Sequence, residues 1–187
     1  MRTKDSFSAE AALSKLKDGN TRYLSATHCG GDISLSLRVK TYAEGQSPYA
    51  VIITCSDSRV IPESIFDVGI GELFVIRVAG NVIDRHQLGS VEYAVSHLGC
   101  RLVVVMGHDH CGAVDAALNH DPEGYVKSIT DEIKRAIGEE KDPDAACILN
   151  VKNSVRMIEN ELCKSDTNDV SVVGAIYRLR DGRVEWL

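Results

Sequence analysis

The sequence has no long apolar segment, either internally or at its start. No run approaches the roughly 18 consecutive apolar residues of a membrane-spanning helix, so we expect no membrane partner. Residues 1–6 lack the apolar region of a secretory signal, which makes the cytoplasm the expected location.

The sequence also lacks a dense basic cluster and a glycine-rich phosphate loop. The net charge is −6, and no group of Lys and Arg could follow a nucleic-acid backbone, so we expect no nucleic-acid partner. No predicted strand is followed by the glycine-rich loop of phosphate-binding α/β proteins, which argues against that class.

The six cysteines lack the spacing of a disulfide framework, and a reducing cytosol would keep them as thiols. Only Cys55 and Cys111 lie inside polar, glycine-flanked motifs. The others are interpreted as packed or incidental thiols, and they are Cys29, Cys100, Cys147 and Cys163.

Continuous apolar runs of strand length alternate with helical segments. These runs predict strands at residues 49–54, 73–78, 102–106 and 170–177. Helices are predicted at 61–67 and 87–98. Continuous runs indicate strands that are covered on both faces, and the alternation with helices indicates a parallel sheet. The turn at Asp181-Gly182 leads into a final edge strand. We therefore expect an α/β fold with a mostly parallel central sheet, four parallel strands plus a C-terminal antiparallel edge strand, flanked by helices.

An N-terminal helical arm is predicted to precede this core. It contains helices at 8–25 and 35–45, and Ser8 is the expected N-cap of the first. The apolar stripe of that helix is expected to contain Leu13, Leu16 and Leu24. Later helices are predicted at 112–118, 124–138 and 143–164. The length fits one domain over residues 1–187, with the arm at 1–45, which can pack on a partner subunit, and the α/β core at 46–187.

Two polar motifs directly follow predicted strands. Residues 55–59 read Cys-Ser-Asp-Ser-Arg, and residues 107–112 read Gly-His-Asp-His-Cys-Gly. Because ligand sites of open α/β sheets form at the carboxyl ends of the strands, we expect the two motifs to meet. Cys55, His108 and Cys111 then form a Cys2His set, which suits a catalytic zinc ion with a fourth position for water.

Charged neighbours accompany these three residues. Asp57 and Arg59 share a face with Cys55 if the chain stays extended, and Arg59 can hold Asp57 by a bidentate bond. Cys111 is expected at a helix start, where the dipole favours its thiolate. A structural zinc site would need a fourth protein ligand, which only Asp57 or His110 could supply.

Four ordered blocks of the sequence resemble the β-class carbonic anhydrases. The blocks are residues 55–60, 71–81, 90–95 and 107–112, and Gly45-Gln46-Ser47-Pro48 precedes the first at a plant-type spacing. The resemblance implies one Zn²⁺ per chain, held by Cys55, His108 and Cys111. It also implies an Asp57–Arg59 dyad that serves zinc-bound hydroxide in the hydration of carbon dioxide to bicarbonate. In a closed family state, Asp57 itself binds the zinc.

The same resemblance implies a small substrate pocket and an oligomer. Its lining positions match Gln46, Phe74, Ala79, Tyr93 and Gly112. Gln46 can bond a substrate oxygen across a subunit interface, and Tyr93 also matches an interface position. Family members are homodimers or dimers of dimers.

The chain departs from the family pattern at several positions. Ile52 stands where some members have a tryptophan of a non-catalytic bicarbonate site, although Arg77 matches another residue of that site. His110 and His86 are interpreted as solvated loop histidines, with a proton shuttle as the alternative. Other functions left open are hydrolysis of carbonyl sulfide or carbon disulfide, and a non-enzymatic zinc-binding interaction module.

Overall fold

One five-stranded sheet forms the centre of the computed structural model, which describes residues 7–26, 30–163 and 169–187. The strand order is β2-β1-β3-β4-β5. The first four strands pair in parallel, and β5 pairs with β4 in antiparallel fashion. The bounds are β1 Ala50–Thr54, β2 Leu73–Arg77, β3 Leu102–His108, β4 Ser171–Tyr177 and β5 Val184–Trp186. The predicted fold class is confirmed.

The helices lie close to their predicted positions. Their bounds are α1 Ala9–Ser25, α2 Leu35–Glu44, α3 Pro62–Ile65, α4 Arg85–Leu98, α5 Gly112–Asn119, α6 Gly124–Ile137 and α7 Pro143–Leu162, with a 3-10 turn, η1, at Ala79–Asn81. The helix predicted at 87–98 begins two residues earlier, because Asp84 and Gln87 form a reciprocal capping box. The helix predicted at 61–67 is only a single turn.

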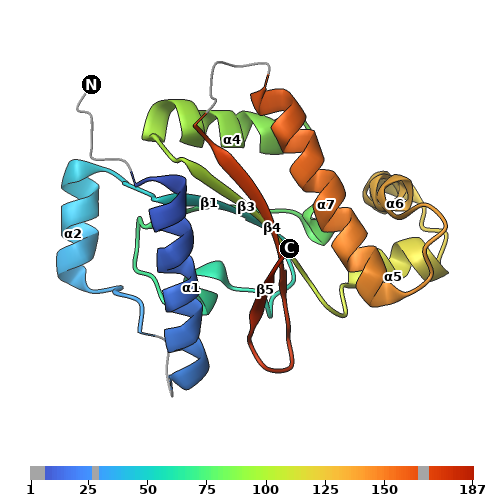
Figure 1. Cartoon of the computed structure of the whole chain (residues 1–187), viewed down its shortest axis with the longest axis horizontal. Coiled ribbons are helices and arrows are strands. Elements are labelled where there is room, and N and C mark those ends of the chain that lie inside the picture. Colours follow the sequence, from blue (N-terminus) through green and yellow to red (C-terminus); the bar gives the residue numbers. More distant parts are fainter. Residues whose placement is uncertain (1–6, 27–29, 164–168) are drawn as a thin grey trace.

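Successive residues of each central strand pack into different halves of the core. In β1, Val51 and Ile53 face the cluster that includes α4 and α7, whereas Ala50 and Ile52 face the cluster that includes α1. Figure 1 shows the sheet between these helices. This burial on both faces explains why the strands read as continuous apolar runs.

Helix α1 packs on the sheet of its own chain. Ser8 caps it as predicted, and Leu16 is fully buried, but the inclusion of Leu24 in the apolar stripe was wrong because its side chain is 45% exposed. Asn20 occupies the buried face instead, where its amide donates to the carbonyl oxygens of Ile65 at 3.2 Å and Gly182 at 2.9 Å. The first part of the predicted arm is therefore fixed to its own core.

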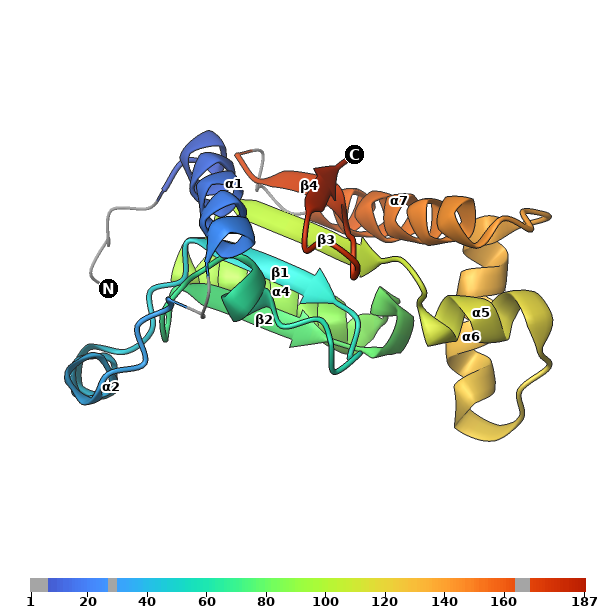
Figure 2. The ribbon, with the colours of Figure 1, turned by 90° about the horizontal axis from the view of Figure 1, so that it is seen from below.

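Helix α2 has a different character. None of its residues is buried, and its large apolar side chains are exposed, Leu35 at 67%, Val39 at 59% and Tyr42 at 93%. Figure 2 shows α2 standing away from the sheet, at the end opposite α5 and α6. An amphipathic helix of this kind normally buries its apolar face against another surface.

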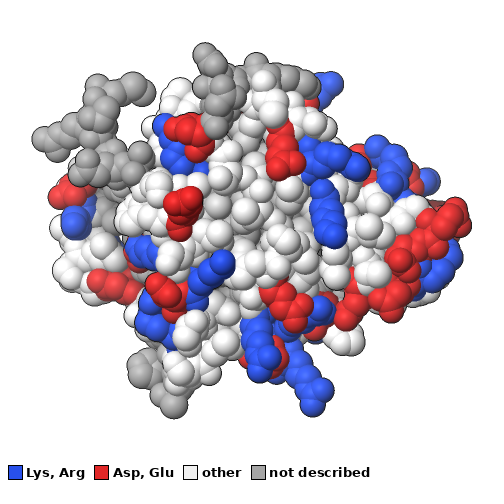
Figure 3. Space-filling view, viewed as in Figure 1, with Lys and Arg blue, Asp and Glu red and all other residues white. Residues whose placement is uncertain are grey.

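The length of the helices and the distribution of surface charge can be compared with what membrane or nucleic-acid binding requires. Among the described residues, no helix combines the length and the apolar character needed to cross a membrane. Figure 3 shows Lys and Arg interspersed with Asp and Glu on the face in view, without a continuous basic track. That face therefore offers no pattern suited to a nucleic-acid backbone.

Candidate metal centre

The two polar motifs meet at the carboxyl edge of the sheet. Cys55 directly follows β1, His108 is the last residue of β3, and Cys111 is the N-cap of α5. The candidate ligand atoms of these three buried residues all lie within 4.8 Å of one another. Figure 2 shows this edge, where the arrowheads of β1 and β3 point towards α5.

His108 is placed by strand pairing rather than by a turn. The strand predicted at 102–106 continues to His108, which lies opposite Tyr177 of β4. Gly107 is needed for packing, because a Cβ there would lie 2.6 Å from Cγ2 of Val151 on α7. The last two residues of β3 therefore bring the imidazole to the sheet edge in a fixed orientation.

The imidazole of His108 has one ring nitrogen without a partner. Its Nδ1 lies 2.7 Å from the carbonyl oxygen of Asp109, so this nitrogen carries the proton and donates. Its Nε2 is buried and has no hydrogen-bond partner among the described residues. A buried, unpaired nitrogen lone pair that faces two cysteine sulfurs suits a metal cation. The donor set therefore fits zinc.

The two thiols differ in acidity. The pKa of Cys55 is lowered, mainly by the neighbouring Cys111 thiol, with a further hydrogen bond from the Gly80 N–H, whose nitrogen lies 3.3 Å from Sγ. The pKa of Cys111 is raised by the adjacent Cys55 sulfur and by burial. The backbone N–H groups of Ala113 and Val114 at the start of α5 act in the opposite direction and lower the pKa of Cys111, as its place at a helix start leads us to expect. A dication would favour the thiolate form of both.

Asp57 and Arg59 form a bidentate ion pair beside the three ligand atoms. Arg59 Nε donates to Oδ1 at 2.9 Å and Nη2 donates to Oδ2 at 2.8 Å. The expected extended backbone was wrong, because residues 58–59 form a turn in which the Arg59 N–H also bonds Oδ1. The pKa of Asp57 is lowered, chiefly by Arg59. Oδ2 lies 3.9 Å from Nε2 of His108, at the margin of the ligand cluster.

Arg77 braces the segment that carries Cys55 and Asp57. Its Nε donates to the Cys55 carbonyl oxygen at 3.3 Å, and its Nη2 donates to the Asp57 carbonyl oxygen at 2.7 Å. The sequence did not predict this supporting role of Arg77. It indicated only that Arg77 matches a residue of the family's non-catalytic bicarbonate site. Its position at the end of β2, beside the end of β1, was the available signal.

The predicted pocket residues separate into two groups. Ala79 and Gly112 lie beside the candidate metal ligands, since Ala79 precedes Gly80 and Gly112 follows Cys111. Gln46 lies before the amino end of β1, whereas Cys55 lies beyond its carboxyl end. Within one chain, the length of the strand therefore separates Gln46 from the metal ligands.

The other two predicted pocket residues contact each other. Phe74 is the second residue of β2 and pairs with Val51, and its ring lies 6.1 Å from the ring of Tyr93 on α4. Tyr93 is 47% exposed. Together with Gln46, they form a second group of predicted pocket residues, and Gln46 and Phe74 lie towards the amino ends of β1 and β2.

Neither His110 nor His86, the two histidines interpreted as loop residues, belongs to the ligand cluster. His110 is exposed and has a positive φ of 49°, and its carbonyl oxygen accepts a bond from Arg59 at 3.4 Å. The side chain of His86 is 95% exposed beside Asp84. Of the four cysteines interpreted as incidental, Cys100 and Cys147 are buried, Cys163 is exposed, and Cys29 lies outside the described residues.

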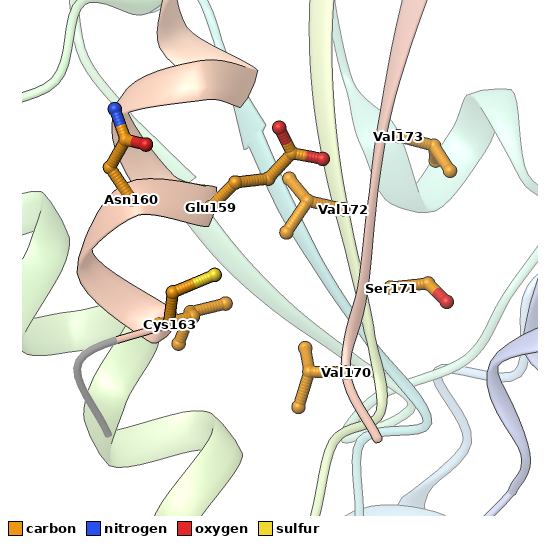
Figure 4. Close-up of a pocket in the computed structure, with 8 residues that line it drawn as sticks. Glu159, Asn160, Cys163, Val170, Ser171, Val172 and Val173 are labelled. Carbon is orange, nitrogen blue, oxygen red and sulfur yellow. The ribbon is translucent and has the colours of Figure 1, made fainter. Parts of the chain in front are cut away.

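A pocket of about 620 Å³ lies elsewhere, between the end of α7 and the start of β4. Figure 4 shows Glu159 of α7, Cys163 at the C-cap of that helix and Val172 of β4 pointing into this space. Because Ser171 pairs with Leu102 at the amino end of β3, this pocket lies at the opposite edge of the sheet from His108. The pocket is therefore separate from the candidate metal ligands.

Comparisons with known proteins agree with the fold. A family model described as carbonic anhydrase matches residues 50–184. The carbonic anhydrase of Mycolicibacterium smegmatis is 35% identical over 189 residues, covering 94% of this chain and 91% of the relative. Carbonic anhydrase 2 of Mycobacterium tuberculosis is 37% identical over 187 residues, covering 92% and 90%.

Solved structures with the same fold include one of two tetrameric β-carbonic anhydrases from Sordaria macrospora. It has a TM-score of 0.71 and 26% identity, and the match covers 82% of this chain and 87% of that one. The β-carbonic anhydrase CafA of Aspergillus fumigatus has a TM-score of 0.70 and 26% identity, with 95% and 89% covered. The chain therefore belongs to the β-carbonic anhydrase family of enzymes.

Proposed function

We propose that this protein catalyses the reversible hydration of carbon dioxide to bicarbonate and a proton at a zinc ion. The observation that carries the proposal is the unpaired Nε2 of His108, which is buried between two cysteine sulfurs and beside an Asp–Arg pair. One zinc per chain would be held by Cys55, His108 and Cys111. A structural role for the zinc gives no reason for the Asp57–Arg59 pair.

When bound, zinc supplies the Lewis acidity that lowers the pKa of a water molecule to about 7. Asp57 accepts a hydrogen bond from the attacking water and orients its lone pair towards the carbon of carbon dioxide. Because the pKa of Asp57 is lowered, the carboxylate stays an acceptor throughout the neutral range. Arg59 holds both carboxylate oxygens and so opposes rotation of Asp57 onto the metal. The intact pair supports the proposal that the dyad stands in the open family state.

We propose that a second copy of the chain completes the substrate pocket. Gln46, Phe74 and Tyr93 are separated from the metal ligands within one chain, so they can line a pocket only at a partner's metal centre. Ala79 and Gly112 would contribute to the pocket from the same chain as the zinc. The proposed assembly is a homodimer or a dimer of dimers, and the tetrameric relative from Sordaria macrospora is consistent with it.

The arm at residues 1–45 is proposed to form part of this subunit contact through α2. Replacing Tyr42 by Glu places a charge on the exposed apolar face, and we expect the assembly to shift towards monomer. Light scattering coupled to size-exclusion chromatography measures the mass. Ser36→Glu on the same helix is the control and keeps the wild-type mass. An unchanged mass for Tyr42→Glu contradicts the proposed role of α2.

A substrate comparison tests the proposed reaction. Stopped-flow measurements on the zinc-loaded protein would follow carbon dioxide hydration, and parallel assays would follow hydrolysis of carbonyl sulfide and carbon disulfide. We expect hydration to dominate. Hydrolysis of a sulfur compound without hydration supports the alternative hydrolase on the same fold, and no turnover of any of the three supports a non-enzymatic zinc module. The cytoplasmic location stays a prediction.

A further inference from the structure

The buried face of α7 carries polar side chains directly behind the metal ligands. Cys147, Asn150 and Ser154 are 5%, 2% and 1% exposed, and their spacing places them along one side of the helix. Buried polar groups are costly unless they find hydrogen-bond partners. The identity of those partners therefore indicates why this face is polar.

All three side chains bond to backbone groups at the metal centre. Asn150 Nδ2 donates to the Gly80 carbonyl oxygen at 2.7 Å, and Ser154 Oγ donates to the Asn81 carbonyl oxygen at 3.2 Å. The Cys147 sulfur accepts a hydrogen bond from the backbone N–H of Cys111. Helix α7 thus holds both the η1 turn and the start of α5.

The η1 turn is held in a geometry that aims one N–H at a metal ligand. Gly80 has a φ of +67°, and its N–H lies 3.3 Å from Cys55 Sγ. A Cβ on Gly80 would lie 2.8 Å from Cδ1 of Ile133, so the turn is closely packed from that side. The bond from Asn150 to the Gly80 carbonyl restricts the remaining backbone freedom of the glycine.

We propose that Asn150 is a positioning residue for the metal centre, which holds Gly80 so that its N–H donates to Cys55 Sγ and withdraws charge from that thiolate. The proposal rests on the proposed zinc site. Two thiolates neutralise a zinc dication and weaken its Lewis acidity. An N–H donor on one sulfur partly restores that acidity, as hydrogen bonds to metal ligands commonly tune the metal.

The test compares Asn150→Ala with Asn153→Ala. Asn153 is an amide of the same helix that donates to Met157 Sδ at 3.5 Å and accepts from Arg156 Nη2 at 2.7 Å, and both of these partners belong to α7. Each protein is loaded with Co²⁺ in place of zinc. In Asn150→Ala the Gly80 carbonyl is released, and the Gly80 N–H moves away from the Cys55 sulfur. The sulfur is then richer in electrons, so its absorption band of charge transfer to cobalt moves to longer wavelength. In the zinc enzyme, the pH midpoint of kcat/KM rises by about half a pH unit.

A purely structural role for Asn150 would lower stability without moving the band or the midpoint. The proposal is overturned if both values in Asn150→Ala equal those of Asn153→Ala and wild type. Metal binding without hydration would count against the proposed function alone, because the cobalt spectrum needs no turnover. If the wild-type protein bound no cobalt, that result would contradict both the proposed metal site and the proposed role of Asn150.

A measurement on the unmodified chain covers the case in which Asn150→Ala does not fold. The protein is loaded with ¹¹³Cd²⁺, whose nuclear spin couples to an amide proton across an N–H···S bond to a ligand sulfur. We expect the Gly80 amide proton to show this coupling. Its absence, with cadmium bound, overturns the inference.

Discussion

Replacing Asp57 by Asn lowers kcat/KM for carbon dioxide hydration by about 100-fold or more, while zinc content stays at the wild-type level. The amide still fits beside Arg59, but it has one acceptor oxygen instead of two and carries no charge. A positioned carboxylate in this kind of role typically contributes about 10²–10⁴-fold. Asp57 is not among the three buried ligand residues, so the metal is retained.

Asp131→Asn is the matched control for this result. Asp131 also forms an ion pair, with Lys127 Nζ at 2.7 Å, but it lies on α6 outside the ligand cluster. Its hydration rate should equal that of wild type. Stopped-flow kinetics and metal analysis on the same preparations would decide the matter. Full activity in Asp57→Asn would remove Asp57 from the mechanism, whereas loss of zinc would make it a ligand.

Cys111→Ser should reduce bound zinc from about one per chain to less than about a tenth after dialysis against a chelator, and hydration should fall with it. Serine is a favoured N-cap, so α5 should still begin correctly at this position. The loss of zinc is then caused by the missing thiolate and not by disruption of helix α5. Circular dichroism would verify that the helices remain.

The control for the Cys111 variant is another buried cysteine. Cys100 lies outside the ligand cluster, and its thiol donates to the Pro48 carbonyl oxygen at 3.4 Å, a bond that a hydroxyl can replace. Cys100→Ser should keep its zinc and its activity. If Cys111→Ser also kept its zinc, the assignment of Cys111 as a ligand would be wrong.

Much of the fold was predictable because burial on both faces leaves a direct mark on the sequence. The strands of the parallel sheet appear as continuous apolar runs, and the ligand motifs follow them at once. The extent of β3 was not predictable, since Gly107 and His108 join the strand through pairing with β4, which is distant in sequence. Leu24 was misassigned because helical periodicity alone does not indicate where the covering sheet ends.

The cluster of three candidate metal ligands was predictable from the sequence, whereas the residues that support it were not. The chemistry of Cys55, His108 and Cys111 is visible in two short motifs. Asn150 on α7 has no motif, and its bond to Gly80 spans 70 positions in sequence. Gln46 looked like a pocket residue by resemblance, yet its place before β1 separates it from the metal ligands of its own chain. Such contacts join residues that are distant in sequence or belong to different subunits, so no short motif indicates them.

The central claim is that a zinc ion at the Cys55–His108–Cys111 cluster hydrates carbon dioxide. A titration of metal-free protein with zinc, with the hydration rate measured at each step above neutral pH, tests it most directly. We predict that the rate rises linearly and stops rising at about one zinc per chain. Binding of one zinc per chain without hydration would contradict the claim.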